Sequence, residues 1–134
     1  MSYDLKDIRT ALVLPGTDLN VYESISGAQS LPFAVLGDPD KNTYNKKNYT
    51  GTAEVELPLW VVVSRSDDTS ARRALDKATA IGKPGSVYDA IRALADVVDA
   101  PWRTVTCLSH GPYGTTTFNK QPALAVAFNL TITA

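Results

Sequence analysis

Alternating apolar and polar positions predict two long strands in this chain. In residues 54–64, the alternate positions that form one apolar face are Val55, Leu57, Leu59, Val61 and Val63. In residues 124–133, the corresponding positions are Leu124, Val126, Phe128, Leu130 and Ile132. Successive side chains of a strand point to opposite faces, so each segment predicts a strand with one buried face. Within the first strand, Pro58 has no N–H to donate to a ladder and predicts an edge position or a bulge.

Shorter apolar runs predict the remaining strands. Residues 21–25 alternate, residues 33–36 are wholly apolar and end at turn residues, and residues 103–108 follow Pro101 and Trp102. The turn-rich segment 109–122 predicts a further short strand around Thr116 and Phe118.

Helical spacing predicts three helices. In residues 4–13, capped by Asp4, the inward positions are Leu5, Ile8 and Leu12. In residues 69–81, they are Ala71, Ala74, Leu75, Ala78 and Ile81, and Gly82 then breaks the helix. Ser86 and Asp89 form a variant of the capping box for a third helix, whose inward positions are Val87, Ile91, Leu94 and Val98.

The order of these elements predicts an α+β fold in a single domain over residues 1–134. We expect a mainly antiparallel sheet of four to five strands packed against two central helices, with a short N-terminal helix and a long strand–strand loop. That loop is the polar segment 38–52, DPDKNTYNKKNYTGT, which is either a long exposed loop or the tip of an extended hairpin.

Composition narrows the class of protein. Hydrophobic residues make up 44% and charged residues 20% of the chain, which is ordinary for a folded soluble protein. The net charge of -1 gives no electrostatic reason for tight binding to nucleic acid or membrane. Cys107 is the only cysteine, so neither an intrachain disulfide nor a cysteine-rich zinc site can form. The polar start of the chain and the absence of an apolar run of roughly 20 residues predict a soluble protein made in a reducing cytoplasm.

Three segments carry residue types that are used in catalysis. The corner at 64–69 holds Asp67 and Asp68 before a helix, where capping and the helix dipole account for both acids. Cys107 and His110 are a possible nucleophile and base, but residues three apart in a strand point to opposite faces. The segment 82–86, GKPGS, departs from a phosphate-binding loop in spacing and in its Pro, and is typical of a turn. We therefore predict no catalytic residue, cofactor or metal ligand.

Other residues are candidates for protein contacts. The loop carries Tyr44, Lys46, Lys47 and Tyr49, which suit contact with a neighbouring subunit or another protein, although a merely solvated loop is equally compatible. Trp60 lies opposite the apolar face of its strand, where it would pack against another subunit or a second core layer. Arg72 and Arg73 would meet an acidic side chain across such an interface.

The chain resembles the tail terminator, or tail completion, proteins of long-tailed bacteriophages over nearly its whole length. The segments that carry the resemblance are YDLKDIRTALV, LPFAVLGDPD, VELPLWVVVS, ARRALDKATA, GSVYDAIRAL and ALAVAFNLTIT. The resemblance implies a homo-hexameric ring, assembled in the bacterial cytoplasm, at the head-proximal end of the tail in the virion. Its partners would be the tail tube protein and the head–tail connector (neck) protein, with DNA passing transiently through the ring and no membrane involved.

Two other readings stay open at this point. A head-closure (neck) protein or a tail-tube subunit would be structural as well. A small enzyme or ligand-binding domain would instead use the 64–69 corner and His110, although no converging set of acid, base and nucleophile is visible.

Overall fold

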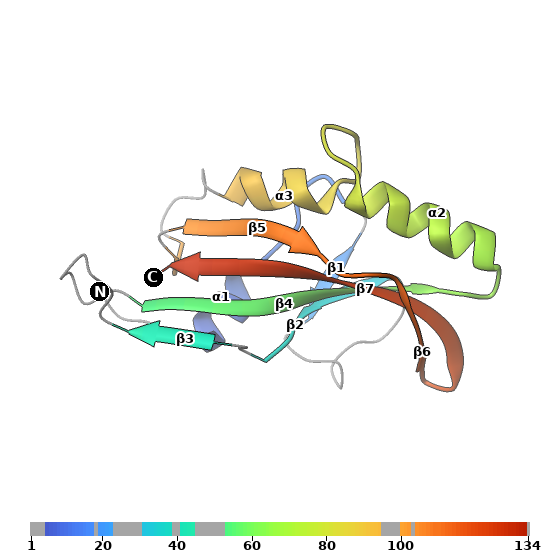
Figure 1. The fold of residues 1–134 in the computed structure, drawn as a ribbon, viewed down its shortest axis with the longest axis horizontal. Helices are drawn as coiled ribbons and strands as arrows, with labels where there is room; N and C mark the ends of the chain where they lie inside the picture. The colour runs from blue at the N-terminus through green and yellow to red at the C-terminus, as the bar shows by residue number, and fades with distance from the viewer. Residues whose placement is uncertain are drawn as a thin grey trace.

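A computed structural model describes residues 5–17, 19–22, 31–38, 41–44, 53–94, 100–102 and 104–133. Over these residues the chain forms three helices and one seven-stranded sheet, which confirms the α+β class (Figure 1). In chain order the elements are α1 (Leu5–Ala11), β1 (Asn20–Tyr22), β2 (Phe33–Leu36), β3 (Lys41–Tyr44), β4 (Ala53–Ser64), α2 (Asp68–Thr79), α3 (Val87–Ala93), β5 (Thr104–His110), β6 (Gly114–Phe118) and β7 (Gln121–Thr133).

The two long predicted strands, β4 and β7, form the centre of the sheet. They pair antiparallel from Glu54 opposite Thr133 to Ser64 opposite Ala123. The main strand order is β1-β2-β4-β7-β5, while β3 pairs with β4 in line with β2, and β6 pairs with β7 in line with β5. All pairings among the described strands are antiparallel except that of β1 with β2, so the sheet is mainly antiparallel, as predicted.

The expected count of four to five strands is slightly too low, because residues 41–44 form an additional strand and the short predicted strands all join the same sheet. Residues 41–44, inside the predicted long loop, form β3 and pair with the start of β4, from Lys41 opposite Glu56 to Tyr44 opposite Ala53. The segment is therefore an extended hairpin at least as far as Tyr44. Residues 45–52, which connect β3 to β4, lie outside the described residues.

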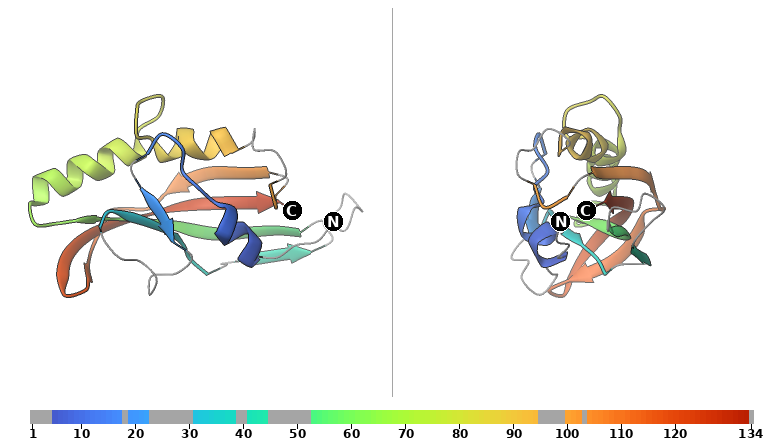
Figure 2. Two further views of the ribbon diagram at one scale, coloured as in Figure 1. Left: turned by 180° about the vertical axis from the view of Figure 1, so that it is seen from behind. Right: turned by 90° about the vertical axis from the view of Figure 1, so that its left-hand side faces the viewer.

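The sheet buries apolar side chains on both faces. The larger core cluster contains the predicted inward residues of β4 and β7 together with residues of all three helices, which lie on one side of the curved sheet (Figure 2). On the opposite face, the smaller cluster of Phe33, Val35, Val62, Ala123 and Ala125 is covered by Phe118 of β6. The rings of Phe33 and Phe118 lie 4.9 Å apart between their centroids. The predicted alternation is confirmed, and among the described residues the second face has a core only at one end.

Pro58 does not lie on an edge strand, because β4 is flanked on both sides. Its carbonyl accepts a hydrogen bond from the Gly37 N–H at 2.8 Å, so its backbone faces the side of β4 that carries β2 and β3. On that side β2 ends at Leu36 and β3 begins at Lys41. The proline therefore occupies the place where the partner strand is interrupted, and its missing N–H costs no ladder hydrogen bond.

Helices α2 and α3 begin at their predicted caps, but α2 ends earlier than predicted and two of its predicted inward residues are exposed. Asp67 and Ser86 are the N-caps of α2 and α3, as their side-chain types predict. The helix predicted to run to residue 81 ends at Thr79, and Ile81 beyond it is 68% exposed rather than buried. Ala74 is also exposed. Asp4 and Val98, predicted as a cap and an inward residue, lie outside the described residues.

Candidate functional site

The strand-to-helix corner at residues 64–69 is built from helix caps. A carboxylate oxygen of Asp67 accepts from the Thr69 N–H at 3.2 Å, and the other accepts from the Ser70 hydroxyl at 2.6 Å. The Ser70 hydrogen bond holds the pKa of Asp67 below its ordinary value of 3.8. Asp68 pairs with Arg72 one turn later at 2.9 Å. Both acids are thus engaged in stabilising the start of α2, as the sequence predicts.

In the loop between α2 and α3, a carboxylate from the first turn of α3 lies where a phosphate-binding loop would hold an anion. The Gly82 N–H donates to the Asp89 carboxylate at 2.8 Å, and Gly82 has a φ of 74°. Ser86 is 3% exposed, and its hydroxyl accepts from the Asp89 N–H at 3.1 Å and donates to the Ala80 carbonyl. The prediction of a turn for GKPGS is confirmed, since these donors are already satisfied within the chain.

Cys107 and His110 lie on the same face of the sheet, which corrects the expectation that they point to opposite faces. The pairing of β5 with β7 shifts between Cys107 and Ser109, so Leu108 is an extra, bulged residue. Cys107 then lies opposite Leu130 and His110 opposite Phe128, two residues of the larger core cluster. Burial raises the pKa of the Cys107 thiol, which disfavours the nucleophilic thiolate. The His110 Nδ1 lies 2.8 Å from the Gly111 carbonyl.

The register keeps the 64–69 corner apart from His110. His110 lies opposite Phe128, which in turn lies opposite Leu59 of β4. Ser64, where the corner begins, is five residues further along that strand, or about 16 Å at the usual rise. The two segments that a catalytic reading would combine are therefore not brought together.

A hydrogen-bonded cluster fastens the β5–β6 connection to α2. The Tyr113 hydroxyl donates to the Asp76 carboxylate at 2.6 Å and lies 3.1 Å from the Thr79 hydroxyl. Burial, together with the Asp76 hydrogen bond, raises the pKa of Tyr113 above its ordinary value. Because the phenol stays protonated, it can keep donating to Asp76 and hold the connection in place.

Trp60 is a predicted contact residue on β4 whose side chain the structure describes. Its side chain is 39% exposed and lies on the face of the sheet that the helices leave free. On the two neighbouring strands, Val35 of β2 and Ala127 of β7 are its paired residues. In the part of the chain that the structure describes, Trp60 does not belong to the smaller cluster that forms the second core layer. A half-exposed Trp on a sheet face is available for a protein contact.

The other predicted contact residues have different outcomes. Arg72 is engaged with Asp68 on its own helix, whereas Arg73 is exposed on α2. Tyr44 ends β3, but the direction of its side chain is not described. Lys46, Lys47 and Tyr49 lie outside the described residues.

Sequence patterns missed three exposed apolar side chains. Ile81 and Leu108 are 68% and 64% exposed, and both border one small hollow beside His110 and Phe128. Val13, after the end of α1, is 57% exposed. The helix pattern predicted Ile81 as inward, and a bulge such as the one at Leu108 leaves no mark on alternation. The preference for burial of large aliphatic residues makes these exposed positions notable.

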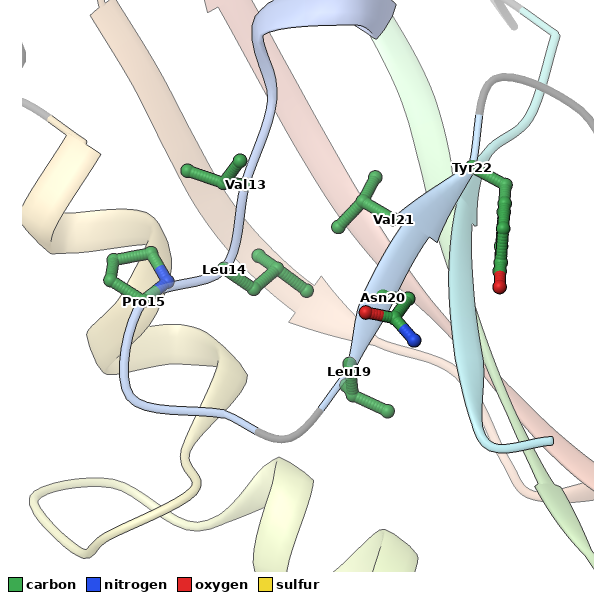
Figure 3. Close-up of a pocket in the computed structure, with 7 residues that line it drawn as sticks. All are labelled: Val13, Leu14, Pro15, Leu19, Asn20, Val21 and Tyr22. Atoms are coloured by element: carbon green, nitrogen blue, oxygen red, sulfur yellow. The ribbon is translucent and has the colours of Figure 1, made fainter. Parts of the chain in front are cut away.

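Val13 borders a larger hollow of about 580 Å³ between α1 and β1. The chain forms an open U there, with Val13, Leu14 and Pro15 on one limb and Leu19–Tyr22 on the other (Figure 3). Leu14 and Val21 point into the space between the limbs. Five of the seven described lining residues are aliphatic or proline, but Leu14 among them is almost fully buried, so the surface open to an occupant is mixed in polarity.

Within the described ranges, no group of three or more His, Cys, Asp or Glu side chains is placed to hold a metal ion. Of the helices in those ranges, none has the length and apolar character needed to cross a bilayer. Comparison with known protein families and with curated protein sequences gave no match.

Proposed function

We propose that this chain is a structural component of a bacteriophage virion that caps the head-proximal end of the tail tube as a six-membered ring. In this role it ends tail polymerisation and forms the surface that joins the tail to the head connector. The ring would assemble in the host cytoplasm and surround the channel through which DNA passes.

The observation that carries the proposal is a sheet with two unlike lateral edges. In the described part of the chain, β1 pairs only with β2, and β5 pairs only with β7, at opposite ends of the strand order. Unpaired strand edges readily accept another strand or subunit. Two different surfaces on one chain support head-to-tail contacts between copies, and such contacts generate a ring when the rotation between copies closes.

The helix-free face of the sheet supports a second kind of contact. The smaller cluster covers only one end of this face, and beyond it lie Trp60, Ala127 and the exposed Asn129. The β3–β4 hairpin extends the same sheet at the opposite end from the β6–β7 hairpin (Figure 1). A ring that uses its edges laterally has this face and the β3–β4 hairpin free to meet the tube or the connector.

The hairpin offers a direct test of tail capping. Deleting residues 46–49 removes Lys46, Lys47 and Tyr49 and leaves four residues to join β3 to β4, a length that hairpins tolerate. We expect the variant to fold with unchanged thermal stability and to give tails of uncontrolled length or tails that do not join heads. A variant in which both lysines are replaced by Ser keeps the length of the connection and separates the effect of charge from that of reach. Normal virions from the deletion variant would show that the hairpin is not a contact element.

Electron microscopy of the purified protein distinguishes the related structural roles. A terminator is expected to stop at a single ring, whereas a tube subunit stacks rings into long polymers. A head-closure protein would bind purified connectors and leave tube ends uncapped.

A further inference from the structure

One exposed aromatic ring lies in a polar part of the helix-free face of the sheet. Among the Trp and Phe side chains in the described part of the chain, only Trp60 is exposed. Beyond the smaller cluster, and apart from Pro58 and Ala127, its neighbours on this face are an amide, two hydroxyls and a carboxylate. They belong to Asn129, Ser109, Thr131 and Glu56.

The backbone of Gly37 fixes how the indole ring of Trp60 lies. A Cβ on Gly37 would lie 3.2 Å from the Nε1 atom of Trp60 and 3.3 Å from its Cδ1 atom, so this edge of the ring rests on the glycine. Gly37 is held in turn, because its N–H donates to the Pro58 carbonyl at 2.8 Å and its carbonyl accepts from the Arg9 guanidinium at 2.9 Å. The indole therefore leans along the sheet with one edge packed, and a ring held in this way has little freedom to lose when a ligand stacks on it.

The strand register places hydrogen-bonding groups at regular distances from the ring. Asn129 lies on β7 two residues from the position paired with Trp60, or about 7 Å along the sheet. Its amide donates to the hydroxyl of Ser109, its paired residue on β5, at 2.8 Å. Glu56 and Thr131 form the next pair of the same face, about 13 Å from the Trp60 pair. An aromatic ring is thus followed by an amide and then by a hydroxyl and a carboxylate.

This combination matches the chemistry of a sugar better than that of a protein or a nucleic acid. One face of a pyranose ring carries C–H groups that pack on an aromatic ring, and its hydroxyls need both donors and acceptors. A protein interface has an apolar core larger than the single ring of Trp60. Nucleic acid also stacks its bases on aromatic rings, but it needs cations for its phosphates, and the charged side chain described beside Asn129 and Thr131 is the acid Glu56.

We propose that Trp60 and the polar side chains beside it bind a short neutral oligosaccharide. One sugar unit stacks on the indole, and the following units lie over Asn129 and then over Thr131 and Glu56. The amide, hydroxyl and carboxylate groups of these residues exchange hydrogen bonds with the sugar hydroxyls. This inference goes beyond the proposed function, because the binding needs neither a ring nor a tail.

Titration of the purified protein with sugars tests the site. The probes are maltotriose, cellotriose and chitotriose, and the signal is the intrinsic fluorescence of Trp60, since Trp102 is buried. We expect at least one of these trisaccharides to bind with a Kd of about 0.1–10 mM. Saturation-transfer NMR should then show magnetisation passing from the indole protons to the C–H protons of one sugar unit.

Substitutions locate the binding on this face. Trp60→Ala should abolish it and Trp60→Phe should weaken it, while circular dichroism shows an unchanged fold because Trp60 is exposed. Asn129→Ala should raise the Kd about 3- to 10-fold, as expected for the loss of one hydrogen bond. Thr104→Ala is the matched control, because Thr104 is exposed and lies opposite Thr133 at the far end of the sheet. Its Kd should equal that of the wild type.

Other results would overturn the proposal. These are no binding of any of the three trisaccharides, or equal affinities of the wild type and Trp60→Ala. Binding of oligothymidine or of purified tail tubes that depends on Trp60, without trisaccharide binding, would assign the ring to nucleic acid or to a protein contact. Failure at this site leaves tail capping standing, since capping is assayed separately. Sugar binding by a protein that neither forms rings nor caps tails would refute the proposed function and support this site.

Discussion

The α3 cap offers a sharp test of how the helices are fixed to the sheet. Ser86 is 3% exposed, and its hydroxyl both accepts from the Asp89 N–H and donates to the Ala80 carbonyl. Ser86→Ala removes the cap, which costs about 1 kcal/mol, and leaves a partly buried N–H and carbonyl without this partner, at about 1–2 kcal/mol more. We therefore expect a loss of about 2–3 kcal/mol in the free energy of unfolding.

Urea denaturation followed by far-UV circular dichroism measures this loss. For a domain of this size it corresponds to a fall of roughly 6–12 °C in melting temperature. Asp67→Ala is the matched comparison, because Asp67 caps α2 in full contact with solvent and water can replace its hydrogen bonds. The reasoning predicts a clearly smaller loss for Asp67→Ala. Equal losses for the two variants, or a loss below about 1 kcal/mol for Ser86→Ala, would refute the importance of burial at the α3 cap.

Three further predictions concern backbone geometry and charge. A Cβ on Gly37 would lie 2.8 Å from the Pro58 Cγ, so Gly37→Ala should lower the free energy of unfolding by about 1–3 kcal/mol. Adding Pro58→Ala removes the clashing atom and should restore part of that loss. A double-mutant cycle measured by urea denaturation tests this coupling. Lys120 adopts a φ of 64° in the two-residue turn between β6 and β7, next to Asn119 at 50°. Because glycine adopts positive φ without strain, Lys120→Gly should stabilise the fold by about 0.5–1 kcal/mol and raise the melting temperature. A lower melting temperature would contradict the type I′ turn. The pKa of Asp67 is lowered in the folded state, so its stabilising contribution is present above the ordinary value of 3.8 and is lost as the pH falls through the lowered pKa. The wild type should therefore lose more stability on acidification below about pH 5 than Asp67→Asn does. Parallel losses in the two proteins would argue against this linkage.

The long strands and helix caps could be predicted because their signals are local. Val55 through Val63 and Leu124 through Ile132 alternate without interruption, and the structure buries every inward residue of both runs. Asp67 and Ser86 carry the side chains that caps require, and both act as N-caps. Periodicity and capping chemistry depend only on neighbouring residues, so they are readable from the sequence.

The errors arose where the outcome depends on a distant segment. Pro58 predicts an edge position or a bulge, yet it lies in a central strand with a regular register to β7. The strand tolerates it because β2 and β3 leave a gap opposite it. Cys107 and His110 were predicted on opposite faces, yet a bulge at Leu108, visible only from the pairing with β7, brings them to one face. The helical pattern that placed Ile81 inward continued beyond the true end of α2. The first two features are set by strand pairing, which no local pattern records.

The exposed apolar surfaces bear most on function. Trp60 could be predicted as facing away from the main core, but its half-exposure follows from how far the β6–β7 hairpin reaches over that face. The hollow bordered by Ile81 and Leu108 and the hollow bordered by Val13 each join residues from separate elements, so neither could be read from sequence spacing. The predicted contact role of the Lys46–Lys47 segment remains a prediction, because those residues lie outside the described part of the chain.

The central claim is that copies of this chain close into one six-membered ring that caps a tail tube. The most direct measurement is the mass of the assembly, by native mass spectrometry of the purified protein and of protein released from capped tails, with electron microscopy of the same samples. The account predicts a species of six chains, each of 14.4 kDa, that forms single rings and does not grow. Monomers in both samples, or rings that stack into open-ended tubes, would contradict it.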